Sequence, residues 1–108
     1  MIVRRATRGD FQAYYGRPPP MTLRGLVAAS STGILGFGGY YRKDGVAVVF
    51  SDNRPHMSKR DIVRGARELM GLVRECGLPA VANVGHAGDA ALRHYGFEPF
   101  GNFYRLAP

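Results

Sequence analysis

The residues best suited to chemistry lie in the polar segment 51–60, between an apolar run and a long amphipathic segment. Ser58 can cap a helix, and Lys59 and Arg60 add two positive charges directly after it. A strand that leads into a helix leaves several backbone N–H groups directed at one point, which suits a phosphate. The segment therefore predicts an anion site at the start of a helix.

Two elements must position this segment. Residues 45–50 are apolar and rich in valine, which is typical of a strand buried in the middle of a sheet. Residues 58–76 predict a helix that begins with a capping box of Ser58 and Asp61 and ends at Gly77. Its apolar residues recur at intervals of three and four and predict one buried stripe: Ile62, Val63, Ala66, Leu69, Met70, Val73 and Cys76.

The rest of the chain predicts short elements around this unit. A second capping box, Thr7 with Asp10, opens a brief helix that ends at Gly16, and an Asp44–Gly45 pair marks a hairpin tip. Glycines 36, 38 and 39 indicate a bulge or a close approach of two backbones. Strands are predicted at 2–6, 23–30, 34–41, 80–84 and 100–106, a loop at 85–88, and a short helix at 90–95. The strand at 80–84 is expected to run parallel to 45–50, because the long helix is a natural crossover.

Length and composition narrow the class of protein. A chain of 108 residues predicts a single domain, residues 1–108, and a charged fraction of 21% with a net charge of +7 indicates a folded protein that favours anionic partners. One cysteine excludes an internal disulfide, and the wide spacing of His56, His86 and His94 predicts no metal site. No leader or membrane span is recognised, so we expect a cytoplasmic protein.

The predicted order, β-α-β-β-β-α-β-α-β, resembles the GNAT superfamily of acetyl-CoA-dependent N-acetyltransferases. Residues 2–10 resemble the first strand and capped first helix of that family, and residues 89–98 resemble its late helix followed by a Gly–Phe pair, here Gly96 and Phe97. The resemblance spans essentially the whole chain. It implies an α/β (α+β) fold with a mixed, mostly antiparallel sheet flanked by helices.

The resemblance also implies a site for acetyl-CoA. The family holds the pyrophosphate in the loop before the long helix, where Arg54 matches the first residue of its pattern, whereas Met57 and Lys59 replace two small residues. Ser58, Lys59 and Arg60 would offer amides and positive charge, and amides near Val49 and Phe50 would position the pantetheine and thioester. Asn83 would either bond to the pantetheine arm or serve as a turn or cap residue.

For catalysis, the resemblance implies a base near the central strands and an acid on the late helix. Asp52 is the candidate base, with a turn that caps local amides as the alternative. The usual tyrosine position falls near Leu92, so Tyr95 and His94 are the candidate acids, with packing under the Gly–Phe corner as the alternative for Tyr95. The acceptor is expected to be a small-molecule or protein amine. The family's second helix has no counterpart in residues 16–22, so the acceptor lid is expected to be missing or supplied by another subunit of a homo-oligomer.

Two other functions stay open. A noncatalytic protein of the same fold, with an altered loop, could bind a partner or assemble into a larger particle. A basic module could instead bind nucleic acid through one face of the long helix. The alternative is that this face is only solvated, with Asp61 and Glu68 pairing with Arg64. The cations of that face are Arg60, Arg64, Arg67 and Arg74.

Overall fold

The computed structural model of the chain describes residues 1–83 and 89–108, and the loop predicted at 85–88 lies outside the described residues. The described elements follow the predicted order, with one strand more at the end. They are β1 (Ile2–Arg5), α1 (Arg8–Tyr15), β2 (Arg24–Ser30), β3 (Gly33–Lys43), β4 (Val46–Asn53), α2 (Lys59–Glu75), β5 (Ala80–Asn83), α3 (Asp89–His94), β6 (Glu98–Phe100) and β7 (Phe103–Leu106).

The last predicted strand, 100–106, is in fact the end of a hairpin. β6 and β7 pair antiparallel, and Gly101 between them has a φ of 61°, a left-handed conformation that favours glycine. Gly101 and Asn102 form the turn that breaks the run. The prediction of one continuous strand was wrong here because it gave the aromatic residues more weight than this turn pair.

Within the described residues, seven strands form one sheet in the order β1-β2-β3-β4-β5-β7-β6. Its first four strands are antiparallel, and β4 pairs parallel with β5 from Ala47 to Val49, as predicted. The hairpin tip between β3 and β4 is also confirmed, because Asp44 and Gly45 both have positive φ, 52° and 79°. The sheet is therefore mixed and mostly antiparallel.

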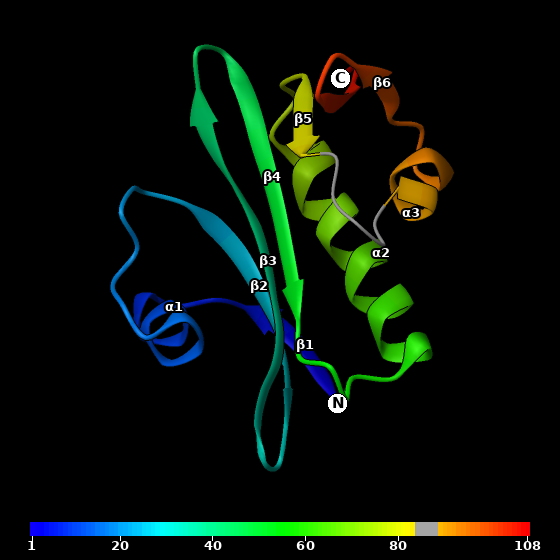
Figure 1. Cartoon of the computed structure of the whole chain (residues 1–108). Coiled ribbons are helices and arrows are strands. Elements are labelled where there is room, and N and C mark those ends of the chain that lie inside the picture. The colour runs from blue at the N-terminus through cyan, green and yellow to red at the C-terminus, as the bar shows by residue number, and fades with distance from the viewer. Residues whose placement is uncertain (84–88) are drawn as a thin grey trace.

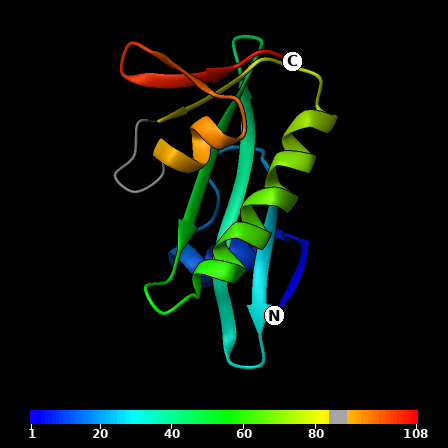
Figure 2. The same ribbon diagram turned by 90° about the vertical axis from the view of Figure 1, so that its right-hand side faces the viewer.

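Helices cover both faces of the sheet (Figure 1). α1 packs on one face, where Phe11, Tyr14, Val27 and Phe37 form a small aromatic core. α2 lies diagonally across the other face, and Figure 2 shows α3 beside it. The larger core lies under α2, and Leu92 and Tyr95 of the α3 region pack against it.

The buried stripe of α2 is confirmed in its second half, where Leu69, Met70 and Val73 are buried together with Leu72. Val63 was expected in this stripe, but 53% of its surface is exposed. It has nearly the same helical phase as Met70. Its exposure follows because no described residue buries this side of the first turns of α2.

Close packing requires two glycines of β3, Gly39 against the backbone of β2 and Gly38 against a side chain of α2. A Cβ on Gly39 would lie 2.3 Å from the carbonyl oxygen of Arg24, and one on Gly38 would lie 2.9 Å from Cδ2 of Leu69. The close approach of two backbones predicted here is confirmed for Gly39, and the β2–β3 register also shifts between Ala28 and Ala29. β3 therefore contacts β2 and α2 at distances that a larger residue would prevent.

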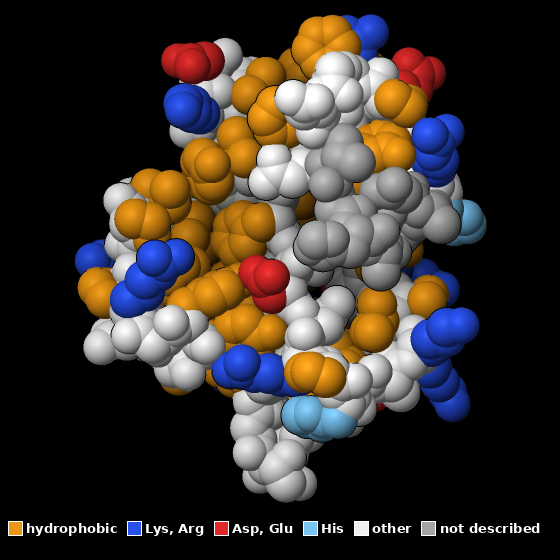
Figure 3. All heavy atoms as spheres, in the orientation of Figure 1, with side chains coloured by type: hydrophobic (Ala, Val, Ile, Leu, Met, Phe, Trp, Pro, Cys, Tyr) orange, Lys and Arg blue, Asp and Glu red, His pale blue; other side chains and the backbone are white. Residues whose placement is uncertain are grey.

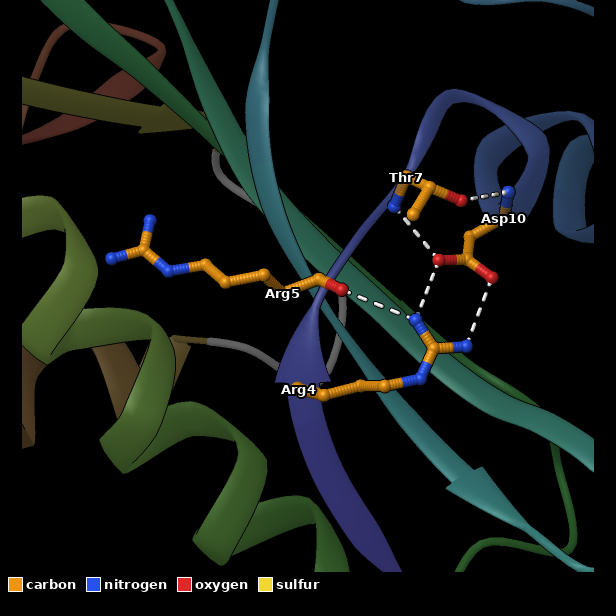
Figure 4. A network of polar contacts seen from close by, with 4 residues as sticks. All are labelled: Arg4, Arg5, Thr7 and Asp10. Atoms are coloured by element: carbon orange, nitrogen blue, oxygen red, sulfur yellow. Dashed lines mark hydrogen bonds and ion pairs between the residues drawn. The ribbon is translucent and has the colours of Figure 1, made fainter.

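A network of polar contacts anchors α1 to β1 (Figure 4). The guanidinium of Arg4 donates two hydrogen bonds to Asp10, of 2.7 and 3.0 Å, and the predicted capping box of Thr7 and Asp10 is complete. The hydrogen bonds from Arg4 lower the pKa of Asp10 well below its usual range. Together these contacts hold the start of α1, and α1 carries Tyr15 at its other end.

Candidate active site

The end of β4 has a free edge, that is, backbone groups with no partner strand among residues 1–83 and 89–108. The amide of Ala47 donates to the carbonyl of Pro79 at 2.9 Å, and peptide groups alternate in direction along a strand, so the odd-numbered residues of β4 face β5. The last β4–β5 pair is Val49 with Ala82, and Ser51 and Asn53 follow it with no described β5 residue in register. Figure 1 shows β4 continuing past the end of β5. The backbone groups of Ser51 and Asn53 are therefore directed to the β5 side of β4, beyond the last described residue of β5.

This edge leads to the N-terminus of α2. The hydroxyl of Ser58 accepts a 3.2 Å hydrogen bond from the amide of Asp61, so half of the predicted capping box forms. The return bond from the Ser58 amide to Asp61 is absent among the described residues, as is any bond from the amides of Lys59 and Arg60. These three amides lie at the positive end of the helix dipole and can bind an anion.

Met57 is buried, with 7% of its surface exposed. Its sulfur would lie 3.3 Å from a Cβ on Gly36, so the side chain points under α2 toward β3. The absence of a side chain at Gly36 provides the room. The thioether therefore occupies the interior beneath the helix. Although Met57 is larger than the residue that the family pattern has here, its side chain does not cover the amides at the start of α2.

The side chain of Arg54 is directed to α1. Its guanidinium lies 4.1 Å from the centre of the Tyr14 ring and donates a 3.0 Å hydrogen bond to the Tyr14 carbonyl. A positive charge at the C-terminal end of α1 also complements the helix dipole. Arg54 thus joins the loop before α2 to α1. The family resemblance implied instead that its side chain would bind phosphate at the start of α2.

Asp52 meets a partner that sequence reasoning missed. The Tyr15 hydroxyl donates a hydrogen bond to Oδ2 of Asp52 at 2.5 Å. Burial raises the pKa of Tyr15, and the hydrogen bond to Asp52 raises this pKa further, so the phenol stays a donor. Both side chains line an open groove of about 200 Å³ on the α1 face. The capped helix predicted to end at Gly16 was the available signal, but nothing in the sequence located its last residues opposite Asp52.

The two candidate acids lie elsewhere. The rings of His94 and Tyr95 are 5.1 Å apart, and Tyr95 packs against the core under α2, on the face of the sheet opposite α1. Neither residue lines the groove that contains Asp52. The described contacts therefore do not bring these residues together with Asp52.

The predicted strand positions divide between the two faces. Val49 is buried toward α2, whereas Phe50 stacks on Phe37 on the α1 face with ring centres 6.1 Å apart. By the same alternation, the backbone of Phe50 faces β3. Asn83 is the last residue of β5, is exposed and pairs with Phe103. The free edge therefore belongs to Ser51 and Asn53, which the sequence reasoning did not select.

The basic face of α2 is exposed, as expected. It borders a wide surface hollow lined by Lys59, Arg60, Arg64 and Arg67. Arg64 donates a hydrogen bond to the carbonyl of Met1 at 3.1 Å, and the expected pairs of Arg64 with Asp61 or Glu68 are absent among the described residues. This face was predicted correctly, but its charges are not neutralised by those carboxylates.

No helix in residues 1–83 and 89–108 has the length and apolar character needed to cross a membrane. In the same residues, no group of three His, Cys, Asp or Glu side chains is placed to hold a metal ion, and His86 lies outside them.

The chain has the fold of the GNAT acetyltransferases, as its likeness to solved structures shows. One similar structure is ribosomal-protein-alanine N-acetyltransferase from Brucella melitensis. The match covers 100% of both chains, with a TM-score of 0.75 and 17% identity. It is also similar to the putative N-acetyl transferase YhhK from E. coli bound to coenzyme A, with a TM-score of 0.67 and 13% identity over 99% of this chain and 98% of that one.

A third similar structure is a GNAT family acetyltransferase from Brucella melitensis in complex with acetyl-CoA. The TM-score is 0.60 and the identity 22%, over 78% of this chain and 57% of that one. No protein-family model matches the sequence, and no curated protein matches it in sequence. At these identities the likeness shows the fold.

Proposed function

We propose that the protein is an N-acetyltransferase that transfers the acetyl group of acetyl-CoA to an amine. The observation that carries this proposal is the free edge of β4, which leads from the last β4–β5 pair to the unpaired amides at the start of α2. Asp52 lies on the same length of β4. Structures of similar fold that hold acetyl-CoA or coenzyme A support the same function.

The residues present fit acetyl-CoA. Lys59 and Arg60 would hold the phosphates with their amides and side-chain charges, since both side chains are exposed. Backbone groups of Ser51 and Asn53 would hold the pantetheine arm as an added strand would. Met57 does not obstruct this path, because its side chain is buried beneath α2. Acetyl-CoA itself supplies an activated acyl group as a thioester.

In this proposal Asp52 acts as the base, directly or through a water molecule. The amine nitrogen forms a bond to the acetyl carbonyl carbon, and the bond from that carbon to sulfur breaks, with its electron pair staying on sulfur. The proton lost by nitrogen passes to Asp52, and solvent protonates the thiolate. Tyr15 keeps the carboxylate in place through its hydrogen bond to Oδ2.

A noncatalytic protein of the same fold is the second candidate. The contacts of Arg54 with the ring and carbonyl of Tyr14 favour this candidate. The family resemblance assigns the Arg54 side chain to phosphate binding, but here it joins the loop before α2 to α1. The two candidates differ in whether acetyl-CoA binds and is consumed.

Calorimetric titration with acetyl-CoA tests the proposal, together with an assay of free thiol released when amines are added. We expect measurable binding, and Lys59→Gln should weaken it about three- to tenfold through the loss of one phosphate contact. Arg74→Gln, which removes an exposed charge from the other end of α2, is the matched control and should bind normally. Absence of heat and of any change in melting temperature at millimolar acetyl-CoA would overturn the proposal.

A further inference from the structure

The groove on the α1 face is built from three parts of the chain. α1 forms one wall, the connector that follows it forms a second, and the ends of β3 and β4 form the floor. Proline residues in the connector restrict its backbone, so this wall is stiff. The lining residues are Phe11, Tyr15, Arg17, Pro20, Met21, Leu23, Tyr41, Phe50 and Asp52.

The size of the groove limits what it can hold. Its volume of about 200 Å³ is below the about 300–1,000 Å³ that is usual for pockets of drug-sized ligands. The acceptor lid was expected to be missing or supplied by another subunit. Here the connector after α1 forms a wall of the groove from the same chain. The groove therefore suits a small molecule better than a length of polypeptide.

Asp52 determines the charge of the ligand. It is the one acidic side chain among the described residues that line the groove, and its Oδ1 receives no hydrogen bond from a described residue. Oδ2 is already held by Tyr15. Aromatic rings around the carboxylate add attraction for a cation through their faces. Figure 3 shows hydrophobic side chains gathered over α1 and the neighbouring strands, with an acidic side chain exposed among them.

Other charges restrict the ligand to one positive group. Arg17 lines the same groove, and the whole chain carries a net charge of +7. A ligand with several positive charges would satisfy Asp52 with one of them and be repelled through the others.

Building on the acetyltransferase function proposed above, we propose that the acceptor is a small primary amine with a single positive charge, whose apolar or aromatic body lies in this groove. The ammonium group donates to Oδ1 of Asp52, and the body contacts Phe11 and Phe50. Asp52 takes one proton from the ammonium group and passes it to solvent, so the amine enters the transfer described above neutral, and the carboxylate can again accept the proton lost during that transfer. The amide product is neutral and no longer pairs with the carboxylate, which favours its release.

The test uses the full chain without acetyl-CoA and measures binding by titration calorimetry and by shifts of backbone amide NMR signals. The probes are 2-phenylethylamine, 2-phenylethanol with the same body but no charge, ethanolamine with the charge but no apolar body, and spermidine with several charges. We expect 2-phenylethylamine to bind at least about tenfold more tightly than each of the others, with signals of Phe11 and Phe50 shifted.

Asp52→Asn should weaken the binding of 2-phenylethylamine about tenfold or more and leave 2-phenylethanol unaffected. Asp44→Asn is the matched control, because it removes an exposed carboxylate at the hairpin tip, where asparagine tolerates the positive φ of 52°. It should leave the binding of all four probes unchanged.

Equal affinity for 2-phenylethylamine and ethanolamine, or an unchanged affinity in Asp52→Asn, would overturn the assigned acceptor class. So would faster acetylation of a peptide with N-terminal alanine than of 2-phenylethylamine. These results leave the acetyltransferase function standing wherever acetyl-CoA binds and another amine is acetylated. Failure to bind acetyl-CoA would instead overturn the function while the amine titrations still report on the groove.

Discussion

The hydroxyl of Tyr15, the last residue of α1, donates a 2.5 Å hydrogen bond to the carboxylate of Asp52 near the end of β4. The two residues are 37 positions apart in the chain. One hydrogen bond therefore couples the placement of α1 to the orientation of the proposed base. Arg54 adds a second link between α1 and the end of β4 through Tyr14.

Removing the Tyr15 hydroxyl should release Asp52. We expect Tyr15→Phe to lower kcat/KM for the amine about tenfold and to reduce the free energy of unfolding by about 1 kcal/mol, because a hydrogen bond to a charged group is lost. Thiol release and urea unfolding measure the two effects. Tyr14→Phe is the control, since no described residue bonds to the Tyr14 hydroxyl and its ring stays under Arg54. Equal losses in the two variants would argue against a positioning role.

Acid should weaken the fold partly through Asp10. Its pKa is lower in the folded chain than the ordinary value of about 3.9, so its contribution to stability is complete above about pH 3.9 and is lost as the pH falls from there through the lower pKa of the folded chain. We expect Asp10→Asn to cost about 1 kcal/mol at pH 7 and progressively less as the pH falls below 4, measured by urea unfolding. Asp44→Asn should instead follow the acid dependence of the natural chain. Parallel curves for the natural chain and Asp10→Asn would contradict the assignment.

Gly39 should be intolerant of any side chain. Because an added Cβ would lie 2.3 Å from the Arg24 carbonyl oxygen, the β2–β3 backbones would have to separate. We expect Gly39→Ala to reduce the free energy of unfolding by about 3 kcal/mol, a cost typical of overpacking. Gly71→Ala in α2 is the matched control, because its Cβ would meet nothing within 4 Å and alanine favours the helix by about 1 kcal/mol. Thermal and urea unfolding of both variants give the comparison, and a stable Gly39→Ala protein would show the strand pairing to be wrong.

Arg54 should matter more for stability than for acetyl-CoA. Arg54→Gln removes the contact with the Tyr14 ring and the bond to its carbonyl, and we expect a loss of about 1 kcal/mol in unfolding free energy. Acetyl-CoA affinity, measured by calorimetry, should fall less than in Lys59→Gln. Arg42→Gln removes an exposed charge from β3 and serves as the control. A large loss of acetyl-CoA affinity with unchanged stability would contradict this expectation and indicate that the Arg54 side chain binds a phosphate.

Local sequence signals predicted most of the elements. The capping residues Thr7 and Ser58, the Asp44–Gly45 hairpin tip and the second half of the α2 stripe are all where the patterns indicated. These features depend on contacts between residues close in the chain, so a short stretch of sequence contains the information. The exceptions are Val63 and the division of the last strand, and the exposure of Val63 depends on what the rest of the chain covers.

For the site, the sequence by itself determined that a strand enters a capped helix and that Asp52 lies near this junction. Only the tertiary structure decided that the side chain of Asp52 faces α1, that Tyr15 reaches it, and that Ser51 and Asn53 carry the free edge of β4. The physical reason is that pairing register and helix packing set which face each side chain and peptide group takes, and a shift of one residue would reverse all of them.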